Sequence, residues 1–378
     1  MSWRACTLGD VLTLKRGHDL PEGARVPGDV PVVSSSGITG RHNTAIADPP
    51  GVVTGRYGTI GEVFFLDEPY WPLNTALYVI DFKGNDPKFS SYLLRNTLRN
   101  YRSEKAAVPG VNRNVLHTLG VSVPDLQTQR KIVSALSAYD DLIENNRRRI
   151  ALLEEAARLL YREWFVHFRF PGHEHAKFID GLPQGWRRQT FGDVCESIGG
   201  GTPATGKPEF WTDGDIPWYT PTDVTRNACL ALLDSATKIT EAGLRGSSAK
   251  MLPAGAVLMT SRASVGFFGI IDTPACTNQG FISVVPHDGR ARMYLLHNLM
   301  QRVEEIRSHA GGATYKEINK SKFRALDVTM PSGKLLQEFE EQGTTLHEQV
   351  RNLYAMNQKL AQARDLLLPR LMSGALAV

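Results

Sequence analysis

Three short motifs bring together residue types that can do chemistry, and the first has the spacing of a nucleotide-binding loop. Gly201, Gly206 and Lys207 match the G-x-x-x-x-G-K pattern, in which backbone amides hold phosphates. That pattern needs a serine or threonine after the lysine to hold Mg²⁺, with a helix beginning there. Pro208 removes the hydroxyl. We therefore expect no nucleotide site, and assign Thr202 and Lys207 to a flexible loop suited to phosphate or base contact.

The other two motifs are also incomplete. Asp48-Pro49-Pro50-Gly51 begins like the D-P-P-aromatic loop of amino-methyltransferases, but Gly51 supplies no ring to stack on a flipped base, so we expect a turn before a strand. His173-Glu174-His175 lies between Pro and Gly residues and offers ligands too close in sequence to define a metal site alone. No catalytic triad or pair of catalytic carboxylates stands out. The sequence predicts no catalytic, metal or cofactor site in this chain.

Composition bounds the class of protein. The 378 residues are 42% hydrophobic and 22% charged, which suits a soluble protein of two domains. No apolar run approaches the ~18–20 residues of a membrane span and no signal-peptide core is seen, so we expect a cytoplasmic location. The four cysteines lie far apart, which argues against disulfides and zinc. The net charge of +4 is compatible with a polyanionic partner but does not establish one.

The chain contains two divergent copies of one unit of roughly 185–200 residues. Trp3-Arg4-x-x-Thr7-Leu8-Gly9-Asp10-Val11 recurs as Trp186-Arg187-x-x-Thr190-Phe191-Gly192-Asp193-Val194. Further echoes follow in constant order: Gly28–Pro31 with Gly214–Pro217, Gly51–Gly61 with Gly255–Gly266, Asn74 with Asn278, Tyr92–Leu94 with Tyr294–Leu296, and Val121–Pro124 with Val328–Pro331. A constant order of matches indicates an internal repeat.

Each copy begins with a domain, at residues 1–124 and 186–331, in which short β-prone runs alternate with turn residues. Each copy ends in a long helix, expected over 125–170 and 332–378, and residues 171–185 form a linker. The apolar seam from Ile132 to Trp164 advances in alternating steps of four and three, the period of a coiled coil, and adding 207 gives a second seam. We expect an α+β fold: two similar, mainly β domains joined by two antiparallel helices that form a coiled-coil spacer with pseudo-twofold symmetry.

The two seams contain polar and small residues whose role the sequence leaves open. Asn146 and Asn357 interrupt the seams, and either fix the register or are solvated polar positions. Gly343 and Arg364 make the second seam imperfect, so this helix is either more loosely packed or partly covered by a partner.

Two related heads on a rigid spacer suggest a reader of double-stranded DNA. DNA presents the same groove face once per turn, about every 34–36 Å, so a pseudo-twofold protein can place both heads on one face. Because the two copies differ in their loops, we expect them to read different half-sites of an asymmetric, bipartite sequence.

Candidate DNA contacts are loop residues that supply cations, donors and acceptors. In the first copy they are Ser34, Ser35, Ser36, Thr39, Arg41, His42, Asn43, Arg56, Tyr57, Lys105, Arg113 and Asn114. In the second copy they are Thr202, Lys207, Tyr219, Thr220, Thr222, Arg226, Asn227, Ser261, Arg262, Thr314, Tyr315, Lys316 and Lys320.

Three segments resemble the specificity subunits of type I restriction–modification systems. They are the helix Ile143–Phe165, Pro183-x-Gly185-Trp186 at the start of the second domain, and Leu366–Gly374 near the end. The resemblance covers essentially the whole chain and implies two target-recognition domains that read a split DNA site through the major groove. It also implies that two modification (methyltransferase) subunits pack around the helices and that restriction subunits join them. S-adenosylmethionine, ATP and Mg²⁺ would be bound by those partners.

Two other functions remain open at the level of sequence. The chain could be a stand-alone DNA methyltransferase or nuclease with an unrecognised site, or a scaffold whose duplicated domains bind proteins. A family member serving another DNA-defence complex is not separable by sequence.

Overall fold

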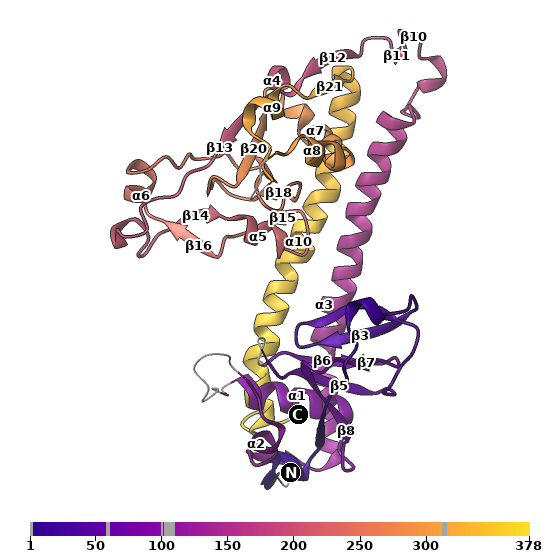
Figure 1. Cartoon of the computed structure of the whole chain (residues 1–378), viewed down its shortest axis with the longest axis vertical. Helices are drawn as coiled ribbons and strands as arrows, with labels where there is room; N and C mark the ends of the chain where they lie inside the picture. The colour runs from indigo at the N-terminus through magenta and orange to yellow at the C-terminus, as the bar shows by residue number, and fades with distance from the viewer. Residues whose placement is uncertain (1–2, 58–60, 100, 102–109, 312–315) are drawn as a thin grey trace. The chain divides into compact units, whose positions relative to one another are not determined.

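The computed structural model describes residues 3–57, 61–99, 101, 110–311 and 316–378, and the chain divides into two compact units (Figure 1). Unit 1 comprises Met1–Ile143 and Lys359–Val378, and unit 2 comprises Glu144–Gln358. Two long helices, α3 (Leu126–Tyr161) and α10 (Gly333–Met372), each contribute one part to either unit. Each unit therefore combines a β-rich domain with segments of both long helices.

Unit 1 contains three small sheets, with strand orders β2-β8-β5-β6, β4-β3-β7 and β1-β9. Valines dominate the buried strand β5 because β-branched side chains fit a pleated surface. The elements are β1 (Trp3–Thr7), β2 (Thr13–Arg16), β3 (Val30–Ser34), β4 (Gly37–His42), β5 (Gly51–Gly55), β6 (Val63–Leu66), β7 (Trp71–Pro72), β8 (Ala76–Asp81), β9 (Gly120–Pro124), the helices α1 (Pro87–Arg99) and α2 (Arg113–His117), and the 3-10 turns η1 (Leu8–Asp10) and η2 (Glu22–Ala24).

Unit 2 contains sheets of order β13-β20-β17-β18-β15, β16-β14-β19 and β12-β21, and a small hairpin β10-β11. Its strands are β10 (Phe178–Ile179), β11 (Leu182–Pro183), β12 (Arg187–Thr190), β13 (Cys195–Gly199), β14 (Ile216–Tyr219), β15 (Ala231–Leu232), β16 (Thr237–Ile239), β17 (Val257–Thr260), β18 (Phe268–Ile271), β19 (Cys276–Thr277), β20 (Phe281–Pro286) and β21 (Asp327–Met330). Its helices are α4 (Phe191–Val194), α5 (Pro221–Thr225), α6 (Glu241–Arg245), α7 (Arg292–Gln301), α8 (Val303–His309) and α9 (Lys320–Arg324), with shorter turns η3 (Arg162–Val166, π-helical), η4 (His173–His175), η5 (Pro208–Phe210) and η6 (Gly289–Ala291).

The predicted duplication is visible in the strand order. Replacing β2, β8, β5 and β6 by β13, β20, β17 and β18 converts the main sheet of unit 1 into that of unit 2. The three-stranded sheets also match, since β3 pairs parallel with β7 and β14 pairs parallel with β19. Unit 2 differs by an insertion between β14 and β16, which adds α5 and the edge strand β15.

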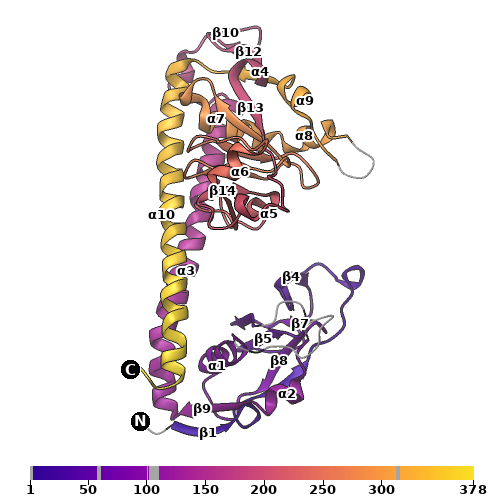
Figure 2. The same cartoon turned by 90° about the vertical axis from the view of Figure 1, so that its left-hand side faces the viewer.

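The long helices pack on each other and on the β-rich domain within each unit. In unit 1, Ile132 and Leu136 of α3 share a core with Leu368 and Leu371 of α10 and with α1. In unit 2, the ring centroid of Phe339 near the start of α10 lies 5.9 Å from that of Trp164 in η3, the turn that directly follows α3. Asn357 meets Asn146 at the other end of this stretch, so the two segments of unit 2 run antiparallel (Figure 2).

Local sequence sets the helix ends. Asp125 caps α3, because its Oδ1 accepts the Thr128 N–H at 2.9 Å. The helical stretch expected to reach residue 170 changes to the π-helical η3 after Tyr161. Gly374, with φ +74°, follows the last turn of α10, where a left-handed residue ends a helix at little strain. No helix among the described residues is long and apolar enough to cross a membrane.

Asn146 and Asn357 pair with each other. Both are buried, 1% and 7% exposed, and the Asn146 Nδ2 donates to the Asn357 Oδ1 at 2.9 Å. The alternative that they are solvated positions is therefore wrong in this structure.

The irregular positions of the second seam also have partners. A Cβ at Gly343 would lie 3.0 Å from Met293 of α7, so the glycine admits that helix close to α10. Arg364 donates to Asp140 of α3 at 2.6 Å, and the Tyr92 hydroxyl bonds the same carboxylate.

Candidate nucleic-acid interface

Three loops of unit 2 meet at one end of the five-stranded sheet. Strand β20 lies between β13 and β17 and is antiparallel to both, which brings the start of β20 beside the ends of its neighbours. The loops after β13, after β17 and before β20 therefore adjoin one another. A Cβ at Gly200 would lie 2.1 Å from the Thr277 carbonyl oxygen, so only glycine fits this crossing. The neighbouring Thr202 hydroxyl donates to the Gln279 Oε1 at 2.6 Å.

A fourth segment adds cations to the same end of the sheet. The Ala263 N–H donates to the Lys316 carbonyl at 3.0 Å, and the Ile318 N–H donates to the Ser261 carbonyl at 3.0 Å. Lys320 follows at the start of α9, with its ammonium beside Gly199. We call the exposed side chains gathered here the unit 2 loop surface; they are Thr202, Arg262, Gln279, Lys316 and Lys320.

The unit 2 loop surface carries little internal charge pairing. Arg262 lies 3.8 Å from Glu317, and both side chains are nearly half exposed, so solvent screens this ion pair. Lys316 and Lys320 are exposed. Such cations are suited to phosphate oxygens, and the hydroxyl and amide of Thr202 and Gln279 can both donate and accept hydrogen bonds.

The corresponding end of the main sheet in unit 1 is built in the same way. A Cβ at Gly17 would lie 2.2 Å from the Leu73 carbonyl oxygen, as Gly200 does with Thr277. The Arg56 N–H donates to the Thr75 carbonyl at 2.9 Å, and its guanidinium lies over the Tyr57 ring at 4.6 Å. We call the side chains at this end the unit 1 loop surface; they are Arg16, Arg56, Tyr57, Asn74 and Arg113.

One cation occupies an equivalent position in both copies. Asn112 caps α2 by accepting the Asn114 N–H, and Asn319 caps α9 by accepting the Lys322 N–H, each at 2.9 Å. The first helical residue is Arg113 in unit 1 and Lys320 in unit 2, and both are exposed. The structure thus pairs two of the predicted contact residues across the repeat.

The predicted contact segment 34–43 is split by the β3–β4 hairpin. Ser34 is 7% exposed and its hydroxyl donates to the Gly37 carbonyl, so it serves the turn rather than a ligand. Ser35 and Ser36 lie at the tip, next to Leu73, whose N–H donates to the Val33 carbonyl. The register Pro31 with Arg41 and Val30 with His42 carries the later residues to the opposite end of the hairpin.

That opposite end contains a structural histidine. His42 is 7% exposed, its Nδ1 accepts the Val26 N–H at 3.0 Å, and its ring meets Trp71 edge-on. The Arg41 guanidinium is exposed but donates to the Asp29 carbonyl. Thr39 and Asn43 are exposed. The His42 side chain therefore serves the fold of unit 1, so its contact with DNA stays a prediction that this structure does not favour, and Arg41 lies away from the unit 1 loop surface.

Several predicted contacts of unit 2 are also internal. Tyr219 is 1% exposed and burial raises its pKa. Ser261 is 3% exposed. Thr220 caps α5 by bonding Asp223, and Asn227 is hydrogen-bonded to Tyr354 of α10. The side chains of Tyr219, Thr220 and Asn227 are thus engaged within the unit and Ser261 is buried, so their contact with DNA stays a prediction that this structure does not favour.

The remaining candidates are exposed or outside the described residues. Asn114, Thr222 and Arg226 are exposed, and Lys207 places its ammonium 4.9 Å from the Phe210 ring centroid. Lys105, Thr314 and Tyr315 lie outside the described residues.

Sequence reasoning missed Arg16, Asn74 and Gln279 as members of the two loop surfaces. The sequence repeat pairs Asn74 with Asn278, but it does not indicate that Asn74, or Gln279 next to Asn278, lies at the end of a sheet. Arg16 ends a strand whose sheet partner was not known from sequence.

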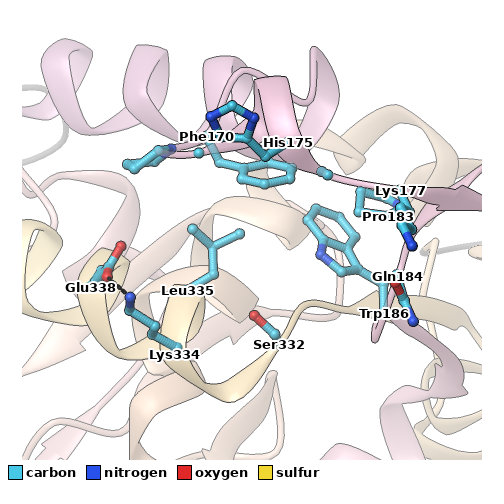
Figure 3. Close-up of a pocket in the computed structure, with 13 residues that line it drawn as sticks. Phe170, His175, Lys177, Pro183, Gln184, Trp186, Ser332, Lys334, Leu335 and Glu338 are labelled. Carbon is cyan, nitrogen blue, oxygen red and sulfur yellow. Dashed lines mark ion pairs between the residues drawn. The ribbon is translucent and has the colours of Figure 1, made fainter.

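A cavity of about 620 Å³ lies in unit 2 at the start of α10 (Figure 3). Phe170 and Trp186 from the linker region face Leu335 across it, and Lys334 pairs with Glu338 at 3.8 Å. The Nδ1 atom of the adjoining His173 lies 2.9 Å from the Phe170 carbonyl oxygen. Among the residues that the structure describes, no three His, Cys, Asp or Glu side chains cluster to hold a metal ion. The cavity is walled by the linker and α10 rather than by the loop surface.

Comparison with known proteins finds specificity subunits of type I restriction systems. The chain is 24% identical over 386 aligned positions to the HindI type I restriction enzyme specificity subunit of Haemophilus influenzae, covering 83% of each chain. It is 32% identical over 171 residues to the MjaIX specificity subunit of Methanocaldococcus jannaschii, which covers 45% of this chain and 39% of that relative. A type I restriction-modification S subunit from M. genitalium has a similar fold, with a TM-score of 0.57, 17% identity, and coverage of 98% and 96%.

The family model matches two stretches of the chain, which fall on the two copies of the repeat. The matched residues are 2–155 and 183–356. This is most of the sequence, and each stretch contains one β-rich domain and part of the long helix that follows it. The chain belongs to the type I restriction modification DNA specificity domain family.

Proposed function

We propose that the chain is the non-catalytic specificity subunit of a type I restriction–modification complex, and that its two domains read the two halves of an asymmetric DNA site. The observation that carries this proposal is the pair of loop surfaces at equivalent ends of the repeated sheet, each with exposed cations. Phosphate contacts by Arg113 and Lys320 would position the domains, and their different neighbouring side chains would select different bases.

We further propose that α3 and α10 act as a coiled-coil spacer between the two recognition domains. The buried Asn146–Asn357 hydrogen bond supports this role, because a polar pair in an apolar seam selects one register. Two modification subunits would pack on the helices, and restriction subunits would join them. S-adenosylmethionine, ATP and Mg²⁺ would be bound by these partners, and the complex would act in the cytoplasm.

The test is selection from a random duplex library by the full chain assembled with its modification subunits, followed by sequencing. A bipartite, non-palindromic motif is the expected result. If the complex retains duplexes without any sequence preference, the result would favour a protein-binding scaffold over a sequence-specific DNA reader. Methylation or cleavage by the chain alone, with S-adenosylmethionine and Mg²⁺ supplied, would contradict a non-catalytic subunit.

A further inference from the structure

The segment 227–232 forms a feature of unit 2 that the main sheet of unit 1 lacks. Its strand β15 extends the five-stranded sheet by pairing parallel with β18, whereas in unit 1 the equivalent strand β6 is the edge. The segment belongs to the insertion after β14, and it contacts both long helices rather than solvent alone.

Two hydrogen bonds tie this segment to the helices. The Tyr354 hydroxyl of α10 donates to the Asn227 Oδ1 at 2.7 Å, and the Asn227 Nδ2 donates to the carbonyls of Cys229 and Ala231 at 2.6 and 2.9 Å. The nitrogen and the oxygen of the Asn227 amide group therefore both have hydrogen-bond partners within the unit. On the other helix, the Glu154 Oε1 accepts the Leu230 N–H at 2.6 Å. Burial raises the pKa of this carboxyl, and the Leu230 bond partly offsets the shift.

Apolar packing fills the space between these bonds. Cys229 and Ala231 share a small core with Ile150 of α3 and with Val350 and Leu353 of α10, all of them at most 9% exposed. At the rim, Arg351 of α10 donates to Asp272, the residue after β18, at 2.9 Å. The contact therefore has an apolar centre and a polar border, as a specific interface does.

A separate contact between the unit 2 domain and α10 lies nearer the start of that helix. There the Arg292 guanidinium and the Met293 N–H of α7 both donate to the Glu340 carboxylate, beside a larger apolar core that includes Phe339. Glu340 and Tyr354 are fourteen residues apart on one helix, or about 21 Å. Two contacts this far apart along one helix restrict rotation of the domain about that helix more than the contact near Glu340 does by itself.

We propose that the segment 227–232 is a positioning element, which fixes the rotation of the second recognition domain on the helices and thereby restricts the complex to one spacer length between half-sites. The proposal rests on the proposed function. One base pair of spacer turns the second half-site by about a tenth of a helical turn, so a domain that cannot pivot must reject the neighbouring lengths.

The experiment uses the full chain assembled with its modification subunits, and duplexes that carry the selected half-sites with the spacer varied by one and two base pairs. The test variant combines Tyr354→Phe with Glu154→Ala, which removes both hydrogen bonds while leaving the apolar core. Thr345→Ala, at an exposed hydroxyl of the same helix, is the matched control. Glu154→Gln alone keeps an acceptor for the Leu230 N–H and should behave as wild type.

Wild type and both controls should bind one spacer length at least about tenfold better than its neighbours, given the rotation per base pair. The double variant should keep its half-site sequences and lose most of that preference, and hydrogen exchange at residues 227–232 should accelerate. An unchanged spacer preference with accelerated exchange overturns the positioning role. If hydrogen exchange accelerates across the whole of unit 2, the double variant has disturbed the fold, and the spacer preference is measured instead with Tyr354→Phe alone. An unchanged preference with accelerated exchange at residues 227–232 again overturns the positioning role. No sequence selection by wild type would instead refute the proposed function.

Discussion

Replacing one member of the buried asparagine pair tests whether it holds the two helices in register. Asn146→Leu leaves the Asn357 Oδ1 without the donor that lies 2.9 Å away in the structure. Loss of a hydrogen bond at a buried polar group destabilises a protein by up to about 1–3 kcal/mol, and the added leucine offsets part of that loss through apolar burial. Asn357→Leu should have a similar effect for the same reason.

The double variant Asn146→Leu with Asn357→Leu separates the pair from its members. Two leucines remove both polar groups from the seam, so its free energy of unfolding should equal or exceed that of wild type. For a unit of this size, 1 kcal/mol corresponds to about 2–4 °C in Tm. The single variants should therefore melt below wild type, by up to roughly 12 °C before the offset from the added leucine, and the double variant near or above the wild-type Tm.

The assay is thermal unfolding of the full chain followed by far-ultraviolet circular dichroism, with urea titrations as a second measure of the coupling energy. Because an all-apolar seam specifies register poorly, the double variant should also accept more spacer lengths in DNA selection. Single variants that melt with wild type, or a double variant whose loss is the sum of the two single losses, would refute the reasoning.

Three further outcomes are expected. Arg113→Ala and Lys320→Ala should each weaken DNA binding and reduce the slope of log affinity against log salt by about 0.9, measured by fluorescence anisotropy; an unchanged slope removes that residue as a phosphate contact. Arg364→Met should destabilise unit 1, because it removes the cation beside the three-quarters buried Asp140 and leaves this carboxylate only its Tyr92 hydrogen bond among those described. The loss should be at or below the low end of the roughly 3–5 kcal/mol found when buried ion pairs are broken; urea unfolding with an unchanged midpoint contradicts this. Burial lowers the pKa of His297 to about 4, so the unfolded chain takes up the proton first and stability present above about pH 6.5 is lost as the pH falls toward 4. His297→Phe should flatten this dependence by up to roughly 3 kcal/mol, and parallel pH curves for the two proteins would count against it.

Much of the architecture could be predicted because it depends on periodicity. The steps of four and three between Ile132 and Trp164 are readable without partners, and the repeat of Thr7–Asp10 as Thr190–Asp193 marks two equivalent capping boxes. The α+β character and the duplication follow from these local signals, since a helix or a strand needs only its own spacing of apolar residues.

The candidate site was predicted less well, because composition does not tell which polar side chains a fold consumes. Ser34, His42, Tyr219 and Asn227 have the residue types of DNA contacts, yet each is engaged inside its unit. Gln279 was missed for the converse reason. Its exposure at the end of the sheet depends on β20 lying between β13 and β17, which is a long-range pairing.

By itself the sequence determined the two copies, the long helices and the polar positions in their seams, because repeats and helical periods are properties of neighbouring residues. Only the tertiary structure decided that Asn146 bonds Asn357, that Arg113 and Lys320 are equivalent, and that Asn227 serves the helices rather than a ligand. Those facts depend on which distant segments meet, and a hydrogen-bonding side chain is equally suited to water, to a partner helix or to DNA until packing removes two of the three.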